Sequence, residues 1–458
     1  MAKKKIDTLL ENDDLEFAQF EYVDQAGTVR GKLGRIEDIA KIGAATACIN
    51  GVRGNEEIVM TPLAGLEDGV HKRPIINDPD TAFQMDWRPN TVAILGRMVR
   101  KDGSLHDHCP RSILETVLNS LADHGYTCMV GFENEFYVFE DDDDAIREGR
   151  IKDLRTVGRN RNAYSLARQQ FILPIAEELF RRMKCAGYPL EVFHTEYSRG
   201  MYEYAFVPQD ALTAADGLAR SRLYLKELLA ENGLTTTGMS ALHVVETPNH
   251  SGVHANVSFW KDGKNVFWDG EGLSDLGRKF IAGALATMDD FHVIFRPWVN
   301  SYRRFDPEAF CPVHALWGED NHLVSLRMSH GLKPEKQTRI EHRVSGTDTC
   351  PHLVLAAIIY GGIHGIESDL ELPPQAKVAE LEEQPLLTHT LPLAIEKFKN
   401  SDVARAAFGD EFVDHYSQVR EEECEEFEVY SKENNIEVDY NAPEVTTWEY
   451  QRYFDWLF

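Results

Sequence analysis

Two carboxylates stand two residues apart in the segment GFENEFYVF, whose aromatic content is typical of a β-strand. Because residues i and i+2 of a strand share a face, Glu133 and Glu135 are expected to point the same way and their immediate neighbours the other way. Two carboxylates this close are costly unless a cation or protons separate them. The pair alone therefore indicates either an exposed strand face or a cation site.

Two other segments show the same alternation. The run VHANVSFW places His254 on one strand face with Asn256 and Ser258. In TRIEHRV, a carboxylate shares a face with an arginine on each side, which suits an ion-pair ladder or an anion site that also holds a metal. A lone histidine on such a face is more often a structural hydrogen-bonding group than a ligand, so each segment alone is a weak signal.

The acidic residues gain weight when they are taken together. Glu196 and Glu203 flank YSRGMY, whose glycine suits a strand–turn–strand unit. The candidate metal ligands are five carboxylates and one imidazole: Glu133, Glu135, Glu196, Glu203, Glu341 and His254. Mostly oxygen donors favour Mg²⁺ or Mn²⁺ over zinc. The accompanying arginines, suited to phosphate or carboxylate, are Arg303, Arg304, Arg327, Arg339 and Arg343. Carboxylates that bind metal ions, together with arginines that bind phosphates, are the groups used in phosphoryl transfer.

An α+β fold of two domains is expected to position these residues. Residues 15–100 alternate short β-type runs with turns, and an amphipathic helix follows at 111–124. This change of pattern puts a boundary near residue 108, between domains of residues 1–108 and 109–458. The larger domain is predicted to mix strands at 131–140, 253–260 and 338–345 with helices at 171–186, 210–231 and 351–367. The acidic runs 140–144 and 421–426 are interpreted as solvated faces or loops.

Composition and charge exclude several kinds of protein. Among 458 residues, 48 Lys plus Arg against 75 Asp plus Glu leave a formal net charge of −27. This excess disfavours nucleic acid and anionic membrane surfaces as partners. The N-terminal segment lacks the apolar stretch of a signal peptide, and the longest apolar run, 353–363, is too short to span a bilayer. Seven cysteines without a CxxC pair indicate thiols in a reducing compartment, so we expect a cytoplasmic protein.

The motifs together carry a family resemblance. The chain resembles the glutamine synthetase superfamily in segments that occur in the same order: GFENEFYVF, FHTEYSRGMYEY, NHSGVHANVSFW, NSYRRFDPEAFCPV, LVSLRM and RIEHRVSGTDTCPHLVLAAIIYGGIHGIE. The resemblance runs from about residue 128 to 367. It implies a β-grasp domain for the β-rich first hundred residues, followed by a larger catalytic domain with an antiparallel sheet lining the active site.

The resemblance also implies a cofactor set, namely ATP with two or three Mg²⁺ or Mn²⁺ ions. One cation, near glutamate, would be bound by Glu135, Glu196 and Glu203. The second, which bridges the ATP phosphates, would be bound by Glu133, His254 and Glu341.

Substrate and nucleotide contacts are implied in the same way. Arg304 matches the residue that holds the α-carboxylate of glutamate, with Asn249 and His250 beside it. Arg343 matches the residue facing the γ-carboxylate and the transferred phosphoryl group, and Arg327 is expected to act with these two in catalysis. The implied nucleotide or phosphate contacts are His194, Ser258, Arg327, Lys336 and Arg339.

The implied reaction has two steps. The γ-carboxylate of L-glutamate attacks the γ-phosphate of ATP, giving γ-glutamyl phosphate and ADP, while metals and arginines stabilise the transferred group. An amine then attacks the acyl phosphate and releases phosphate. Water must be kept from the intermediate, so a covering loop is expected.

Two departures from the family pattern bear on the second substrate. Phe310 stands where ammonia-using members have an acidic residue, and Asn50 is the nearest counterpart of an aspartate in their N-terminal domain. Loss of both carboxylates disfavours ammonium and favours an organic amine with a hydrophobic substituent, an alkylamine or an arylamine. A polyamine is disfavoured because its second ammonium would need acidic partners. A loop shift could instead bring Glu308 in as a base.

Smaller departures affect other family positions. His250 replaces a glycine, His322 an arginine, Met201 a glutamine and Asn256 a histidine. The residue that some bacterial members present for adenylylation falls near Leu370, so that regulation is not expected.

Three functions stay open on the sequence alone. The leading prediction is a glutamate–amine ligase of the γ-glutamylamide synthetase subgroup, opening a route of amine catabolism. The alternatives are an ordinary glutamine synthetase and a non-catalytic glutamate or ATP sensor. By analogy with the family we expect a homo-oligomer of two stacked hexameric rings, with Asn50 reaching a neighbour's catalytic domain.

Overall fold

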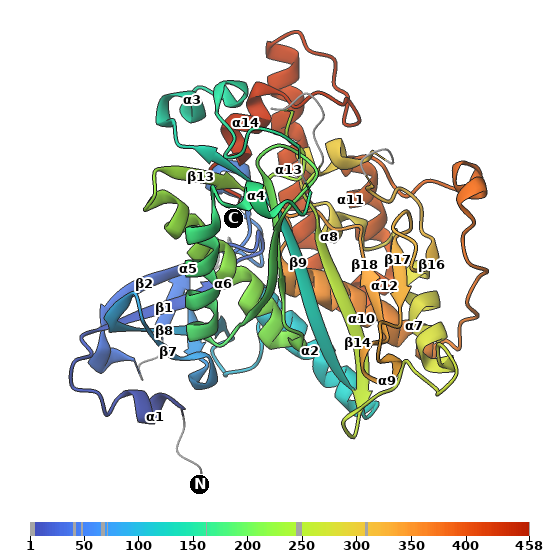
Figure 1. The fold of residues 1–458 in the computed structure, drawn as a ribbon, viewed down its shortest axis with the longest axis horizontal. Coiled ribbons are helices and arrows are strands. Elements are labelled where there is room, and N and C mark those ends of the chain that lie inside the picture. The colour runs from blue at the N-terminus through green and yellow to red at the C-terminus, as the bar shows by residue number, and fades with distance from the viewer. Residues whose placement is uncertain are drawn as a thin grey trace.

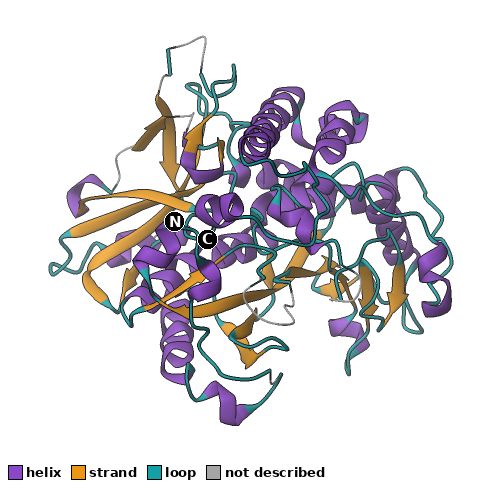
Figure 2. Ribbon diagram, turned by 90° about the horizontal axis from the view of Figure 1, so that it is seen from above, coloured by secondary structure: helices purple, strands orange, loops and turns teal. Residues whose placement is uncertain are grey.

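The structure is a computed structural model that describes residues 5–39, 43–46, 49–65, 69–70, 72–161, 163–243, 250–306 and 310–457. Its strands form two main sheets, one from the first hundred residues and one from the larger remainder. Figure 2 shows helices beside strands throughout the molecule, which confirms the expected α+β class. Among the described helices, none combines the length and the apolar character needed to cross a membrane.

The N-terminal sheet, blue in Figure 1, has the strand order β2-β1-β8-β6-β3, with β7 paired to β8. β1 and β8 run parallel, whereas the other neighbours run antiparallel. Alternate residues such as Ala18, Val92 and Ile94 form a small core of their own. The bounds are α1 Lys5–Leu9, β1 Phe17–Val23, β2 Val29–Arg35, β3 Gly43–Thr46, β4 Val52–Arg53, β5 Glu57–Ile58, β6 Lys72–Asn77, β7 Phe83–Met85 and β8 Arg88–Met98.

The second sheet has the order β10-β11-β9-β14-β18-β17-β16, and its pairs are antiparallel except β16 with β17. The long strands β9 and β14 lie side by side at its centre (Figure 1). Its bounds are β9 Thr127–Glu140, β10 Leu190–Thr195, β11 Met201–Phe206, β12 Gln209–Asp210, β13 Leu234–Thr237, β14 Val253–Lys261, β15 Lys264–Asn265, β16 Trp317–Glu319, β17 Leu326–Ser329 and β18 Arg339–His342. The strands predicted at 131–140, 253–260 and 338–345 are thus confirmed.

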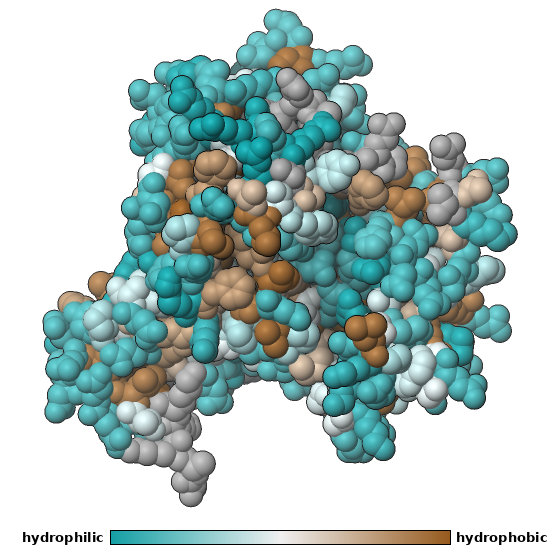
Figure 3. All heavy atoms as spheres, viewed as in Figure 1, coloured by the Kyte–Doolittle hydropathy of each residue, from teal (hydrophilic) through white to brown (hydrophobic). Residues whose placement is uncertain are grey.

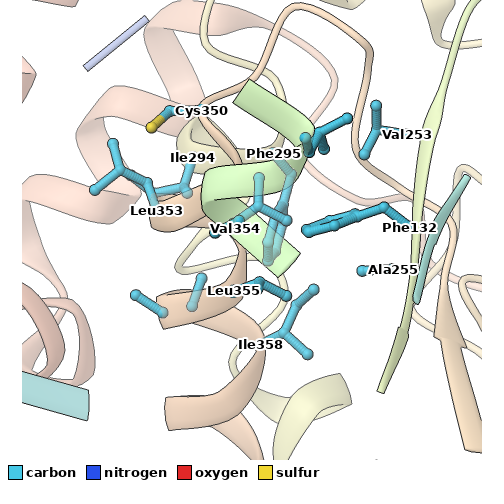
Figure 4. Close-up of a cluster of buried hydrophobic side chains, with 14 of the residues drawn as sticks. Phe132, Val253, Ala255, Ile294, Phe295, Cys350, Leu353, Val354, Leu355 and Ile358 are labelled. Atoms are coloured by element: carbon cyan, nitrogen blue, oxygen red, sulfur yellow. The ribbon is translucent and has the colours of Figure 1, made fainter. Parts of the chain in front are cut away.

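Helices cover the apolar back of this sheet. Figure 4 shows Val354 and Leu355 of α10 facing Phe132, Val253 and Ala255 of the two central strands. The larger helices are α2 Pro110–Asp123, α5 Leu173–Ala186, α6 Ala211–Ala230, α7 Asp275–Ala286, α10 Pro351–Glu367, α11 Leu391–Asn400, α12 Asp402–Phe408, α13 Asp410–Glu433 and α14 Thr447–Tyr453. The shorter helices are α3 Asp143–Arg147, α4 Leu166–Gln169, α8 His292–Phe295 and α9 Pro334–Gln337. The predicted helices at 111–124, 171–186, 210–231 and 351–367 match α2, α5, α6 and α10 within two residues.

The predicted domain boundary near residue 108 falls between the end of β8 and the start of α2. All strands of the first sheet precede it and all strands of the second follow it. The division itself stays a prediction.

One of the two acidic runs contradicts its interpretation as a solvated face. Residues 140–144 are exposed, but Glu423 in the run 421–426 is completely buried. Its carboxylate accepts hydrogen bonds from Nε of Arg452 at 2.7 Å and from the backbone N–H of Gly54 at 2.7 Å. The buried charge therefore connects α13 with α14 and with the N-terminal domain, which sequence periodicity alone could not reveal.

Candidate active site

Strand register brings the predicted metal ligands together on the open face of the second sheet. Glu203 of β11 pairs with Glu135 of β9, and His254 of β14 pairs with Glu133 of β9. Arg327 of β17 lies opposite Glu341 of β18. These side chains line a cavity of about 390 Å³. The predicted site residues in its wall are Glu133, Glu135, Glu196, Glu203, His250, His254, Arg304, Phe310, Arg327, Glu341 and Arg343.

One metal-ligand group contains the residues predicted for the second cation. Ligand atoms of Glu133, His254 and Glu341 lie within 4.8 Å of one another. Nδ1 of His254 is 3.2 Å from Oε2 of Glu133 and 3.5 Å from Oε1 of Glu341. Two carboxylates and one imidazole at this spacing suit a hard divalent cation.

Burial alone would raise the pKa of Glu133, but its hydrogen bonds with His254 and Asn256 outweigh burial and bring the pKa down to about 2. Burial and Arg343 would lower the pKa of His254, whereas the surrounding carboxylates raise it overall. Glu133 therefore stays ionised and ready to bind a cation over the physiological range.

The second group combines His194, Glu196 and Glu203 within the same 4.8 Å limit. Nδ1 of His194 is 3.3 Å from Glu196 and its Nε2 is 3.5 Å from Glu203. Burial opposes protonation of His194, but the two carboxylates prevail and raise its pKa to about 10. In the structure His194 lies between two predicted metal ligands as their counter-charge, and its role as a nucleotide contact stays a prediction.

Glu135, the third ligand predicted for this cation, lies next to Glu203 in register but outside that group. Its Oε2 accepts a hydrogen bond from the backbone N–H of Gly252. Burial raises the pKa of Glu135 to about 7; Glu203 adds to the rise, while His254 and Arg304 oppose it. The carboxylates crowd one another, and a divalent cation would relieve that repulsion. The donor set therefore fits a second Mg²⁺ or Mn²⁺.

The arginines of the cavity are fixed by the strands and turns behind it. Arg304 is 2% exposed and donates from Nη1 to the carbonyl of Val344 at 3.1 Å, while its Nε has no hydrogen-bond partner among the described residues. Arg327 donates to Oε2 of Glu341 at 2.8 Å, and Arg343 donates to Oε1 of the same carboxylate. These guanidiniums offer planar donors to carboxylate or phosphate groups in the cavity.

Three of the predicted nucleotide contacts lie outside the cavity wall. Oγ of Ser258 accepts a hydrogen bond from Trp260 Nε1 at 2.9 Å. Arg339 donates to Asn256 at 2.9 Å, and Asn256 in turn donates to Glu133 at 2.9 Å. Ser258 and Arg339 thus continue the same sheet face away from the cation groups. Lys336 is an exposed residue of α9. Their role in nucleotide binding stays a prediction.

The substrate residues divide into three cases. Phe310 is at the cavity with 55% of its surface exposed and a φ of +57°, an unusual backbone conformation for a phenylalanine. Asn249 lies outside the described residues. Asn50 is 1% exposed, and its side-chain amide donates to the carbonyl of His108 in the same chain. The expectation that Asn50 reaches a neighbour's active site is therefore wrong, because its own chain encloses it.

Some cavity residues were missed by sequence reasoning. Tyr164 and Tyr197 line the cavity with 71% and 57% of their surfaces exposed. Tyr197 follows a predicted ligand within a quoted motif, so its position offered a signal, whereas Tyr164 lies in a loop without one. Met201 and His322 were noted only as departures, and both line the wall. An apolar surface lies over α4 and α5 (Figure 3), and the exposed apolar residues of this part of the sequence include Leu166, Phe171 and Leu173.

Residues 107–439 match the family model of the glutamine synthetase catalytic domain. The chain belongs to the glutamine synthetase family. It is 33% identical over 383 residues to γ-glutamylethanolamide synthetase GlnA4 of Streptomyces coelicolor, covering 82% of this chain and 78% of that protein. It is 27% identical over 464 residues to a glutamate–isopropylamine ligase of Pseudomonas sp, covering 98% and 97% of the two chains.

Other family members are similar at comparable levels. A glutamine synthetase of Pyrococcus furiosus is 28% identical over 458 residues, with 96% of this chain and 97% of that protein covered. A solved structure of a GmaS–ADP complex superposes with a TM-score of 0.79 at 21% identity, covering 98% of each chain, which shows a shared fold. The family and the fold class predicted from the motifs are confirmed.

Proposed function

We propose that this member of the family is an ATP-dependent ligase that joins the γ-carboxyl of L-glutamate to a small organic amine through γ-glutamyl phosphate. The observation that carries the proposal is the composition of one cavity. The same space is lined by groups suited to two divalent cations, by guanidiniums suited to carboxylate and phosphate, and by an exposed phenyl ring.

Glu133, His254 and Glu341 would hold one cation, and Glu196 and Glu203 with Glu135 the other. When bound, the two ions neutralise phosphate charge and orient the γ-phosphoryl group for in-line attack. His194 would then lose its role as the counter-charge of Glu196 and Glu203.

The arginines divide the remaining work. Arg304, enclosed and with an unused Nε, is placed to bind the α-carboxylate of glutamate. Arg343 and Arg327 converge on Glu341, so that they flank the cation group and can stabilise charge on the transferred phosphoryl group. This assignment follows the family resemblance residue by residue.

Phe310 is the feature that favours an organic amine over ammonia. A phenyl ring offers no charge to an ammonium ion but can contact an alkyl group at the cavity mouth. The names of two relatives refer to the amide of a small organic amine, an ethanolamide, and to a small organic amine itself, isopropylamine. Both observations support the γ-glutamylamide synthetase subgroup over ordinary glutamine synthesis.

The test is ADP and phosphate release with glutamate, ATP and Mg²⁺ or Mn²⁺, across ammonia, methylamine, isopropylamine, aniline, a chloroaniline and putrescine. Mass spectrometry would identify the γ-glutamylamide. We expect an apolar amine to be preferred over ammonia and over putrescine. A preference for ammonia would favour ordinary glutamine synthetase as the function. No activity with any amine of the panel would favour a sensor.

The variant Phe310→Glu tests the position of the amine site. A carboxylate there should raise kcat/KM for ammonia by about tenfold, because one added charge contact contributes about 1.4 kcal/mol. The control is Leu332→Glu, since Leu332 is 97% exposed and is not part of the cavity wall. No gain for ammonia in a folded Phe310→Glu variant would contradict the placement of the amine site.

We further propose a cytoplasmic homo-oligomer that serves amine catabolism. The negative net charge of −27 supports the prediction that neither nucleic acid nor an anionic membrane surface is a partner.

A further inference from the structure

One titratable pair at the cavity has been given no proton-transfer role so far. His250 lies in the cavity wall, and its Nε2 is 3.6 Å from Oδ2 of Asp306. The imidazole is enclosed, with 3% of the side chain exposed, whereas the carboxylate of Asp306 is 42% exposed. The pair therefore connects the wall of the cavity with solvent.

His250 is held as a base rather than as a cation. Burial lowers its pKa, and the guanidiniums of Arg304 and Arg296 lower it further, while Asp306 opposes them. The ring of His243 stacks on it with centroids 6.0 Å apart. A neutral imidazole donates from one ring nitrogen and accepts at the other. With Nε2 toward Asp306, the accepting atom is Nδ1, which has no hydrogen-bond partner among the described residues.

The second half of the proposed reaction needs a proton acceptor. An alkylamine is a cation at neutral pH and has no lone pair until it loses a proton, whereas an arylamine is already neutral. The cavity's carboxylates belong to the two cation groups, and Arg327 and Arg343 already contact Glu341. Phe310 cannot accept a proton, and Asn50 is engaged with His108. Of the cavity-wall groups outside the cation clusters, His250 has both an unused acceptor and a carboxylate partner.

We propose that His250, oriented by Asp306, is the general base that deprotonates the incoming amine, and that the amine is therefore a small protonated alkylamine rather than an arylamine. The inference rests on the proposed ligase function and narrows its substrate class. A base in this position next to Arg304 would act beside the bound glutamate, and Phe310 would contact the alkyl group.

Nδ1 of His250 takes one proton from the alkylammonium ion, and Asp306 stabilises the imidazolium that results. The freed nitrogen lone pair forms the C–N bond at the γ-carbonyl carbon while the C–O bond to phosphate breaks. The second proton lost by the nitrogen goes to the departing phosphate, which leaves as HPO₄²⁻. His250 returns its proton to solvent past the half-exposed carboxylate of Asp306.

The test compares protonated and neutral nucleophiles in the same enzyme. Isopropylamine is a cation at pH 7, whereas hydroxylamine and aniline are largely neutral. We expect His250→Asn to lower kcat/KM for isopropylamine by about 10²-fold or more, the usual contribution of a general base, and to change the hydroxylamine reaction less than about threefold. Retained γ-glutamyl hydroxamate formation also shows that the variant folds and binds glutamate and ATP.

Three further variants separate the candidate groups. Asp306→Asn should also lower kcat/KM for isopropylamine more than for hydroxylamine. The loss should be smaller than in His250→Asn, because the variant removes the carboxylate partner but keeps the imidazole. His243→Asn is the matched control: this imidazole stacks on His250 but is not in the cavity wall. Glu308→Gln tests a carboxylate that lies outside the described residues and remains a candidate base from the sequence.

The outcomes are distinct. Equal losses with isopropylamine and hydroxylamine in His250→Asn would show a structural role and overturn the inference while leaving the ligase function in place. A selective loss in Glu308→Gln but not in His250→Asn would assign the base to Glu308. A wild-type enzyme that acts on aniline but not on isopropylamine would overturn the substrate class, and one that acts on no amine, hydroxylamine included, would overturn the ligase function as well.

Discussion

Glu133 and Glu135 stand two residues apart on one strand face, yet their surroundings give them opposite acidities. Glu133 has a pKa of about 2 because hydrogen bonds with His254 and Asn256 outweigh burial. Glu135 has a pKa of about 7 because burial and Glu203 outweigh its cationic neighbours. Near neutral pH the carboxyl of Glu133 is therefore ionised, whereas that of Glu135 still carries a proton in part of the molecules. Glu133 itself should therefore bind a cation without releasing a proton, whereas His254 of the same group, whose pKa the neighbouring carboxylates raise, must lose one.

Cation binding at the second group is expected to depend on pH. At pH 6 Glu135 is largely protonated and His194, with a pKa of about 10, carries its proton between Glu196 and Glu203. A divalent cation must displace these protons, so its affinity should rise with pH, by about a hundredfold per unit near pH 6, where both groups are protonated, and by about tenfold per unit near pH 8, where only His194 is. Titration calorimetry with Mn²⁺ in buffers of different ionisation enthalpy measures the protons released. His194→Asn should weaken the pH dependence of Mn²⁺ affinity. An affinity of the wild-type protein that stays unchanged from pH 6 to 8 would contradict the prediction.

At the scale of elements, two contacts hold the site's scaffold together. The first is the buried carboxylate of Glu423 on α13, which accepts hydrogen bonds from Arg452 and Tyr453 of α14 and from the backbone N–H of Gly54. Burial raises the pKa of Glu423, but Arg452 and these hydrogen bonds lower it overall. The ionised group therefore stabilises the fold above its unfolded-state pKa, and this contribution is lost as the pH falls through the lowered value.

Glu423→Gln should reduce the free energy of unfolding by about 3 kcal/mol at pH 7, because the buried charge of Arg452 keeps only the more exposed Glu57 as a carboxylate partner. Thermal or denaturant unfolding measures the loss, and the difference from wild type should shrink as the pH falls toward the lowered pKa. Glu425→Gln is the matched control, since Glu425 belongs to the same acidic run and is exposed. Equal stabilities of the two variants would contradict the role assigned to Glu423.

The second contact is the close crossing of α7 and α10 behind the sheet. A Cβ atom on Gly365 would overlap the carbonyl oxygen of Lys279 and lie 2.6 Å from the backbone nitrogen of Gly283. The helices can approach this closely only without side chains there, which lets α10 pack its other face on the strands.

Gly365→Ala is expected to reduce the free energy of unfolding by about 1–3 kcal/mol through overpacking, despite the better helix propensity of alanine. Chemical denaturation measures this loss in the free energy of unfolding. Gly272→Ala serves as the control, because a Cβ at Gly272 would meet nothing within 4 Å. If Gly365→Ala were as stable as wild type, the helices would have to separate more easily than their crossing indicates.

At the scale of the whole molecule, buried contacts in the described chain join the first hundred residues to the helices α6 and α13. Besides Gly54 with Glu423, Glu21 of β1 pairs with Arg220 of α6 at 2.7 Å, and both are buried. These contacts fix the first domain against the helices that support the cavity.

We expect a homo-oligomer of twelve chains, as the family resemblance implies. Twelve copies of a 52.0 kDa chain have a mass of about 620 kDa. Light scattering or mass photometry at assay concentration measures the mass of the active species. A monomer of 52.0 kDa with full activity would contradict the expected assembly.

The sequence by itself determined which residues share a strand face and that these faces carry the chemistry. The alternation in GFENEFYVF, VHANVSFW and TRIEHRV is a local property with a period of two residues, so it survives in any correctly formed strand. The main helices and strands were predictable for the same reason. Motif order added the family, which the comparison over residues 107–439 confirmed.

Only the tertiary structure decided which faces meet and which charges are buried. The pairing of His254 with Glu133 and of Glu203 with Glu135 is a matter of register between distant strands. His250 and Asp306 are 56 positions apart in sequence and meet because two loops fold against one cavity. Asn50 and Glu423 were misjudged because burial depends on what the rest of the chain packs around a residue, which no local pattern records.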